Sequence, residues 1–165
     1  MADKLRLSFP REPDSVPAAR AALARFEGQL AASTLYDASL CLSELVTNAI
    51  QHPAAESGDE LELELSLGAD ALTVRVTDPG GGFQPGTPTE GDERGWGLFI
   101  VDQLSTRWGT VPGERTTMWF QIAREDPQRS EPAQRGHSEP AGSGRQRRDE
   151  IANAVAGLRF KPVIQ

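Results

Sequence analysis

The sequence predicts an α+β fold. Stretches in which apolar and polar residues alternate are typical of half-buried strands, and two of them flank a tight turn. Other segments carry apolar residues every three or four positions, which is typical of helices that pack by one face. With 165 residues, the chain is long enough for one domain with a substantial core.

The N-terminal part predicts one strand followed by two helices. Apolar and polar residues alternate at 5–9, as in a half-buried strand that prolines then end. An alanine-rich segment at 15–32 has helical spacing and predicts the first helix. The second is predicted from residue 33 or 34 to 52, where a proline follows. The single cysteine, Cys41, lies on its apolar stripe and is most simply a small buried residue.

The next segments predict a β-hairpin and then a loop. Leucines alternate with polar residues at 60–67, and after a turn at 68–70 the alternation resumes at 72–77. Both strands should have one face on the core and one toward water, as antiparallel sheets allow. Residues 84–93 are rich in Gly, Pro, Thr and acidic side chains without periodicity, which predicts a mobile loop and a candidate lid.

A third helix and a closing hairpin complete the predicted domain. Helical spacing predicts the helix at about 97–107, and alternation predicts strands at 108–111 and 116–122. The compact domain is therefore expected to span residues 1–124. A C-terminal segment then follows that differs sharply in composition.

This C-terminal segment and the charge distribution restrict the classes of function. Residues 125–148 hold few apolar side chains and are predicted to be a disordered linker, whereas 149–165 have the spacing of a short amphipathic helix. Residues 1–124 carry ten Lys or Arg against eighteen Asp or Glu, and this acidic body argues against general nucleic-acid binding. No apolar run is long enough to span a bilayer, and no secretory signal opens the sequence, so a cytoplasmic protein is expected.

Three segments carry residues that suit a nucleotide, and the first is a pair on the second predicted helix. Glu44 and Asn48 are four residues apart, so both side chains point to one face of the helix. The neutral oxygen of Asn48 suits Mg²⁺, and Glu44 beside it could accept a proton from an incoming hydroxyl. A solvated polar helix face is the alternative interpretation.

The second segment is a carboxylate that opens a glycine turn. Asp78 ends the second strand of the hairpin, and Gly80 and Gly82 follow it. The glycines let the backbone turn without a Cβ penalty. An ionised carboxylate only accepts hydrogen bonds, which fits an exocyclic amino group such as that of adenine. A plain strand-ending turn is the alternative, because Asp and Gly are common in turns.

The third segment, Gly95-Trp96-Gly97, immediately precedes the third predicted helix. Backbone N–H groups and the positive end of the helix dipole suit a phosphate there. The segment matches neither the phosphate loop with Gly-Lys-Ser/Thr nor a dinucleotide fingerprint, and a simple glycine-rich helix start is the alternative. Trp96 could stack on a ligand or cover the rim of the pocket. His52, one turn beyond Asn48, fits better as a helix-ending residue.

In this order and on these elements, the three segments resemble the N, G1 and G2 boxes of the Bergerat-fold ATPases, the superfamily of gyrase, the Hsp90 chaperones, histidine kinases and MutL. Residues 42–49 and 95–101 resemble in particular the bacterial anti-sigma-factor serine kinases, and the resemblance covers about residues 5–124. It implies a two-layer α/β sandwich with a mixed, mostly antiparallel sheet and helices on one face. It also implies ATP and Mg²⁺ as cofactors and a homodimer.

The same resemblance implies roles for individual residues. Glu44 is expected to be the general base on a serine of the partner, Asn48 to bind Mg²⁺, and Asp78 to read the adenine amine. The remaining residues expected to bind the nucleotide are Gly80, Gly82, Arg94, Gly95, Trp96, Gly97 and Leu98. Arg94 is included because it adjoins the third segment.

The function implied is an ATP- and Mg²⁺-dependent serine/threonine-protein kinase. Its expected partners are an anti-sigma-factor antagonist, which it phosphorylates, and a sigma factor, which it sequesters. The alternative is a regulatory module that binds ATP and a partner protein without phosphotransfer. A histidine-kinase fragment fits less well, because no dimerisation helix with a phosphoacceptor histidine precedes the predicted domain.

Overall fold

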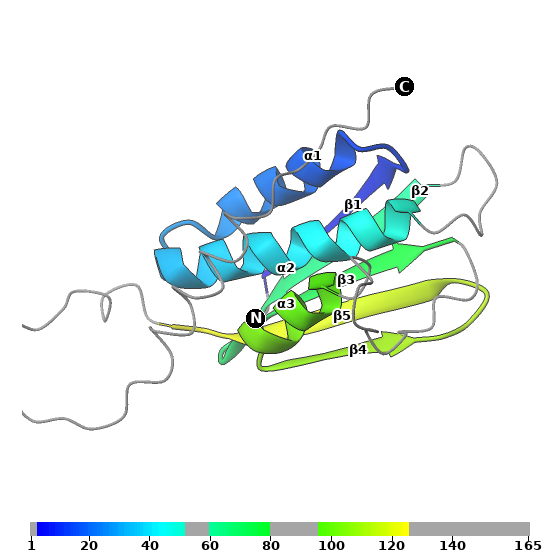
Figure 1. Cartoon of the computed structure of the whole chain (residues 1–165). Helices are drawn as coiled ribbons and strands as arrows, with labels where there is room; N and C mark the ends of the chain where they lie inside the picture. Colours follow the sequence, from blue (N-terminus) through cyan, green and yellow to red (C-terminus); the bar gives the residue numbers. More distant parts are fainter. Residues whose placement is uncertain (1–2, 52–59, 80–95, 126–165) are drawn as a thin grey trace, which may run out of the picture. The chain divides into compact units, whose positions relative to one another are not determined.

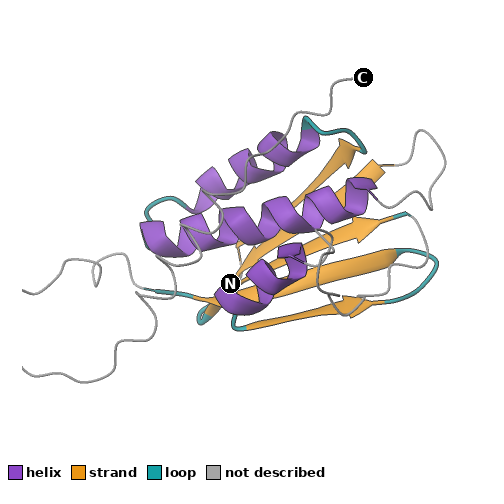
Figure 2. Ribbon diagram, in the orientation of Figure 1, coloured by secondary structure: helices purple, strands orange, loops and turns teal. Residues whose placement is uncertain are grey.

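The computed structural model describes residues 3–51, 60–79 and 96–125. Their elements, in chain order, are β1 (Asp3–Pro10), α1 (Ser15–Ala21), the 3-10 helix η1 (Ala22–Phe26), α2 (Ala32–Gln51), β2 (Glu60–Leu67), β3 (Ala71–Asp78), α3 (Trp96–Leu104), β4 (Arg107–Val111) and β5 (Thr116–Ala123). The strands form one sheet in the order β1-β2-β3-β5-β4. The helices lie on one face of this sheet (Figure 1 and Figure 2). The predicted α+β sandwich is confirmed, and each neighbouring pair of these strands is antiparallel.

The core lies between the inner face of the sheet and the helices. Alternation puts every second residue of β2, β3 and β5 on this face, and the register aligns Leu65 with Val74 and Val74 with Phe120. All three side chains are fully buried. The helix α2 adds an apolar stripe that is also buried: Ala38, Cys41, Leu42, Leu45, Val46 and Ala49. Cys41 is therefore a buried free thiol, as predicted.

The outer face of the sheet is polar. Glu64 of β2 pairs with Lys4 and Arg6 of β1, at N···O distances of 3.1 and 2.7 Å. Glu62 pairs with Arg115 at 2.8 Å. A shallow hollow of about 660 Å³ lies over these strands, and none of the predicted site residues lines it. The candidate site must therefore be sought on the helical side.

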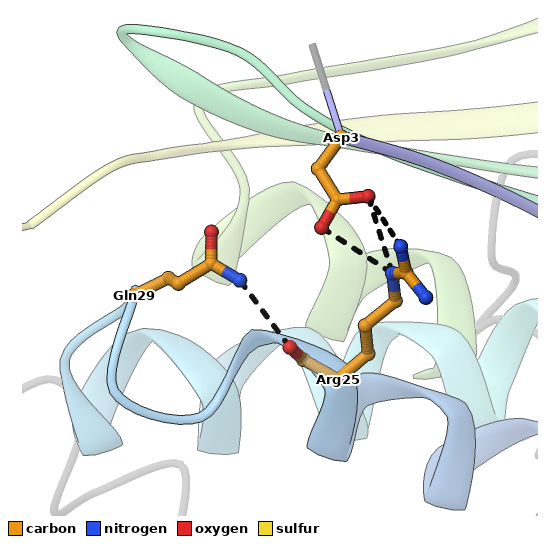
Figure 3. A network of polar contacts seen from close by, with 3 residues as sticks. All are labelled: Asp3, Arg25 and Gln29. Carbon is orange, nitrogen blue, oxygen red and sulfur yellow. Dashed lines mark hydrogen bonds and ion pairs between the residues drawn. The ribbon is translucent and has the colours of Figure 1, made fainter.

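Another exposed ion pair connects the start of β1 to η1 (Figure 3). The guanidinium of Arg25 donates to Asp3, with Nη2 2.7 Å and Nε 3.2 Å from Oδ1. Gln29 in turn donates to the backbone carbonyl of Arg25. Because both charged groups are open to solvent, the pair aligns the two elements more than it stabilises them.

The first helix is shorter than predicted. The α-helical part ends at Ala21 and η1 ends at Phe26, whereas the sequence pattern predicts a helix over 15–32. Gly28 has a φ of 77°, a left-handed conformation that ends a helix, and the N–H of Leu30 bonds back to the carbonyl of Phe26. Leu30 is nevertheless buried. A residue that is buried after a tight turn can therefore have the same spacing in the sequence as a buried residue on a helix.

The third helix also ends earlier than predicted, at Leu104 instead of about 107. Ser105 closes the helix by donating its backbone N–H and its hydroxyl to the carbonyl of Val101. The next backbone N–H, of Thr106, already bonds to the carbonyl of Gln121 in β5. Pairing with β5 therefore converts the end of the predicted helix into the start of β4.

Other predicted segments lie outside the described residues. These are the candidate lid at 84–93, residues 126–148 of the predicted linker, and the predicted C-terminal helix at 149–165. None of the helices in the described part of the chain combines the length and apolar character needed to cross a membrane.

The inward register of β2 can be tested by substitution. Leu65→Ala removes a fully buried side chain from the central row of the sheet, so the free energy of unfolding should fall by about 2–5 kcal/mol. Its neighbour Ser66 faces outward, and Ser66→Ala should change the same quantity by less than about 0.5 kcal/mol. Urea unfolding followed by circular dichroism measures both values. Equal losses in the two variants would contradict the register.

Candidate functional site

The described residues contain part of the predicted site. Gly80, Gly82, Arg94 and Gly95 lie outside them, so the positions of these residues stay predictions. Trp96 is the first residue of α3 and is described by its backbone. The remaining predicted residues are described in full: Glu44, Asn48, Asp78, Gly97 and Leu98.

Glu44 and Asn48 lie on α2, one helical turn apart, as the sequence predicts. Leu45, Val46 and Ala49 beside them are buried in the core. This stripe fixes the rotation of α2, so the two polar side chains lie along the border of the buried face and are half-buried. The helix therefore supplies a carboxylate and an amide at the edge of the core.

The start of α3 lies directly against Glu44. A Cβ atom placed on Gly97 would come within 2.5 Å of Oε2 of Glu44, closer than real contacts allow. A side chain at this position would therefore require the end of the Glu44 side chain to shift. The contact joins the first and third predicted segments, Glu44 and Gly97, at one place.

The environment of Glu44 favours the protonated carboxyl. Burial raises the pKa of Glu44 above its ordinary value, because the charged form loses hydration. Within the described part of the chain, no hydrogen bond or ion pair to this carboxylate offsets that loss. A carboxylate that binds a proton more tightly than usual is suited to act as a general base near neutral pH.

Asp78 continues the inward-facing series of β3. Leu72, Val74 and Val76 face the core, and the same alternation turns Asp78 inward, where the residue is 4% exposed. Its register partner on β5 is Thr116, which is also buried. The carboxylate is thus held by two paired strands at the edge of the core, where water has little access.

Arg11 is a site residue that the sequence reasoning missed. Its Nε lies 3.7 Å from Oδ1 of Asp78, and its Nη2 donates to the carbonyl of Ala49 at 2.7 Å. Ala49 directly follows Asn48 on α2. The available signal was its position at the end of the first strand, but no pattern in the sequence pairs residue 11 with residue 78.

The donors present fit a magnesium nucleotide. No cluster of three or more His, Cys, Asp or Glu side chains in the described residues could hold a metal ion. Magnesium commonly keeps several waters and binds substrate phosphates with only one or two protein oxygens, such as the side-chain oxygen of Asn48. The missing side chain at Gly97 lets the Glu44 carboxylate approach the first turn of α3.

The raised pKa of Glu44 gives a pH-dependent stability. Above this pKa the carboxylate is charged in both states, but it is poorly hydrated in the folded protein and well hydrated in the unfolded chain. We expect Glu44→Gln to melt at a higher temperature than the wild type at neutral pH. The difference should shrink as the pH falls below about 4, where the carboxyl becomes protonated in both the folded and the unfolded state.

Thermal unfolding of both proteins across this pH range measures the effect. Glu62→Gln on the outer face of β2 controls for the loss of one negative charge, because its side chain is exposed. A wild type that is more stable than Glu44→Gln at neutral pH would refute the effect of burial.

Comparisons with known proteins bear on the fold and the family. A search of curated proteins found no significant match. Among solved structures, the chain matches the crystal structure of the RsbU and RsbW domains of Rv1364c from Mycobacterium tuberculosis, with a TM-score of 0.59 and 19% sequence identity. The match covers 74% of the present chain and 32% of that chain. The match thus spans about a third of that chain, and the likeness concerns the fold.

The family is shown by the sequence itself. The profile described as histidine kinase-like ATPase domain matches residues 9–122, which include both helices and the strand end that carry the candidate site. This is more than half of the chain. The protein therefore belongs to the histidine kinase-like ATPase domain family.

Proposed function

We propose that this protein is an ATP- and Mg²⁺-dependent serine/threonine-protein kinase that phosphorylates a small antagonist protein and sequesters a sigma factor in the cytoplasm. The observation that carries the proposal is the half-buried carboxylate of Glu44. It has a raised pKa, lies one turn from Asn48 and contacts the start of α3. A structural role alone does not require a poorly hydrated carboxylate at this place.

Each described residue has a proposed part in phosphoryl transfer. Glu44 takes the proton from the hydroxyl of the partner's serine or threonine. Asn48 would hold Mg²⁺ through its amide oxygen, and Asp78 would accept a hydrogen bond from the adenine amine. ATP would donate its γ-phosphoryl group to that hydroxyl oxygen and leave as ADP, and Mg²⁺ would neutralise charge on the phosphates. The first turn of α3, including Gly97 and Leu98, then lies beside the phosphates.

The glycines and the basic residue of the motifs are proposed to complete the site. Gly80 and Gly82 follow Asp78, and Arg94, Gly95 and Trp96 lead into α3. Family membership supports ATP binding, and the fold shared with a chain that contains an RsbW domain supports the resemblance to anti-sigma-factor kinases. The antagonist, the sigma factor and a homodimer are proposed from this resemblance.

Replacement of Glu44 should separate chemistry from binding. In Glu44→Gln, the side chain keeps its size but no longer accepts a proton, so transfer of phosphate should slow by about 10²- to 10⁴-fold. Binding of Mg-ATP should remain within about threefold of wild type, because neither adenine nor Mg²⁺ is assigned to Glu44 in this proposal. The antagonist is first identified by phosphosite mapping of the proteins that the chain retains in the presence of Mg-ATP. The rate is then measured as transfer of phosphate from radiolabelled ATP to this antagonist.

The matched control is Glu62→Gln, which changes an exposed carboxylate on the outer face of the sheet. Unchanged transfer by Glu44→Gln would remove Glu44 from the mechanism. If Mg-ATP alters the affinity for the partner while no phosphate is transferred by the wild type, the chain is a nucleotide-dependent regulatory module instead.

The close contact between Gly97 and Glu44 gives a second test. Alanine is the better helix former, so Gly97→Ala should not lower stability by propensity. Its Cβ must displace the Glu44 carboxylate, whose Oε2 would otherwise lie 2.5 Å away. We expect transfer to slow by roughly tenfold or more, since misplacement of a base by about 1 Å has a large effect on rate.

The double variant Gly97→Ala/Glu44→Gln identifies the cause. If Gly97→Ala acts by moving Glu44, it should have little further effect once Glu44 is already Gln. Additive losses in the double variant would show that Gly97 acts on the nucleotide independently of Glu44.

A further inference from the structure

Arg11 joins the ends of three elements that the sequence separates widely. It directly follows β1, in a turn where the carbonyl of Pro10 accepts the N–H of Glu12 at 2.9 Å and the hydroxyl of Ser15 at 2.6 Å. Ser15 is buried at the start of α1. The backbone that carries Arg11 is therefore fixed by hydrogen bonds on both sides of the turn.

The guanidinium of Arg11 lies at the C-terminal end of α2. Ala49 is among the last four residues of this helix, whose carbonyls have no intrahelical partner, and its carbonyl accepts Nη2 of Arg11 at 2.7 Å. The last turn of α2 contains no basic residue of its own. Arg11, just after β1, thus supplies the positive charge that favours the negative end of a helix dipole.

The same guanidinium neutralises a buried carboxylate. Its Nε lies 3.7 Å from Oδ1 of Asp78, and the two side chains are 13% and 6% exposed. The pair of Arg25 with Asp3 has the same chemistry, but those side chains are 48% and 33% exposed. The Arg25–Asp3 pair is shorter, at 2.7 Å, but water competes much less for the Arg11–Asp78 pair, so the attraction between its charges is less screened.

We propose that Arg11 is a positioning residue that orients the Asp78 carboxylate and thereby sets the preference of the site for a purine with an exocyclic amino group. This inference rests on the proposed function, in which Asp78 accepts a hydrogen bond from that group. A guanidinium bonded to the carbonyl of Ala49 cannot follow the carboxylate freely. Asp78 is therefore held in one orientation relative to the helix that carries Asn48.

A lysine cannot replace this arrangement fully. Arginine presents several N–H donors in a planar group, so it can bond to Ala49 and lie beside Asp78 at once, whereas an ammonium is a compact point charge. Arg11→Lys should keep the neutralising charge and lose part of the orientation. Arg11→Gln keeps a hydrogen-bond donor and loses the charge.

The test compares ATP with purine riboside triphosphate, which lacks only the exocyclic amino group. Dissociation constants for both Mg-nucleotides are measured by calorimetry on the full chain. Wild type should prefer ATP by about tenfold or more, the effect of one hydrogen bond to a charged acceptor. We expect this ratio to fall to about threefold or less in Arg11→Gln and to an intermediate value in Arg11→Lys.

Arg25→Gln is the matched control, because it removes a guanidinium from the exposed pair with Asp3. Its ratio should equal that of wild type. Thermal unfolding of each variant without nucleotide reports whether it folds. If Arg11→Gln does not fold, the ratio of Arg11→Lys decides. A ratio as high as that of wild type in the Arg11 variants would overturn the inference, even if both nucleotides bind more weakly.

Asp78→Asn distinguishes this inference from the proposed function. Failure of wild type to bind ATP, or a preference for ATP that survives Asp78→Asn, would refute the role of Asp78 itself. A preference that requires Asp78 but not Arg11 would leave the proposed function standing and remove only the positioning role.

Discussion

The negative charge of Asp78 at the edge of an apolar core is the constraint on which the arrangement of the candidate site depends. Alternation along β3 directs this residue to the same face as Leu72, Val74 and Val76. A carboxylate in such a place needs a compensating charge, because water reaches it poorly. Arg11 supplies the charge and bonds the end of α2 as well. The ends of β1, α2 and β3 are therefore held around one buried carboxylate.

Two carboxylates at the border of the same core have different surroundings. Asp78 has a guanidinium beside it, whereas burial raises the pKa of Glu44 and no cation in the described part of the chain is paired with it. Environments that differ in this way suit different tasks, one carboxylate as a fixed acceptor and the other as a proton acceptor. The difference comes from their positions: Asp78 ends β3 within reach of Arg11, and Glu44 faces the first turn of α3.

Much of the fold could be predicted because its signals are local. Alternation predicts the strands that form the sheet, and helical spacing predicts α2 to within about two residues of its ends. The errors occur where a nonlocal interaction or a single glycine overrides the pattern. Gly28 turns the chain before Leu30 can continue a helix, and pairing of Thr106 with β5 ends α3 early.

The sequence by itself determined the strands, the helices, the family motifs and the spacing of Glu44 and Asn48 on one helix face, because these depend on neighbours along the chain. Only the tertiary structure decided that Gly97 touches Glu44 and that Arg11 lies beside Asp78. Both contacts require the order of strands in the sheet and the placement of helices on one face. No repeating pattern in the sequence relates residues that are so far apart along the chain, so their contacts follow from packing alone.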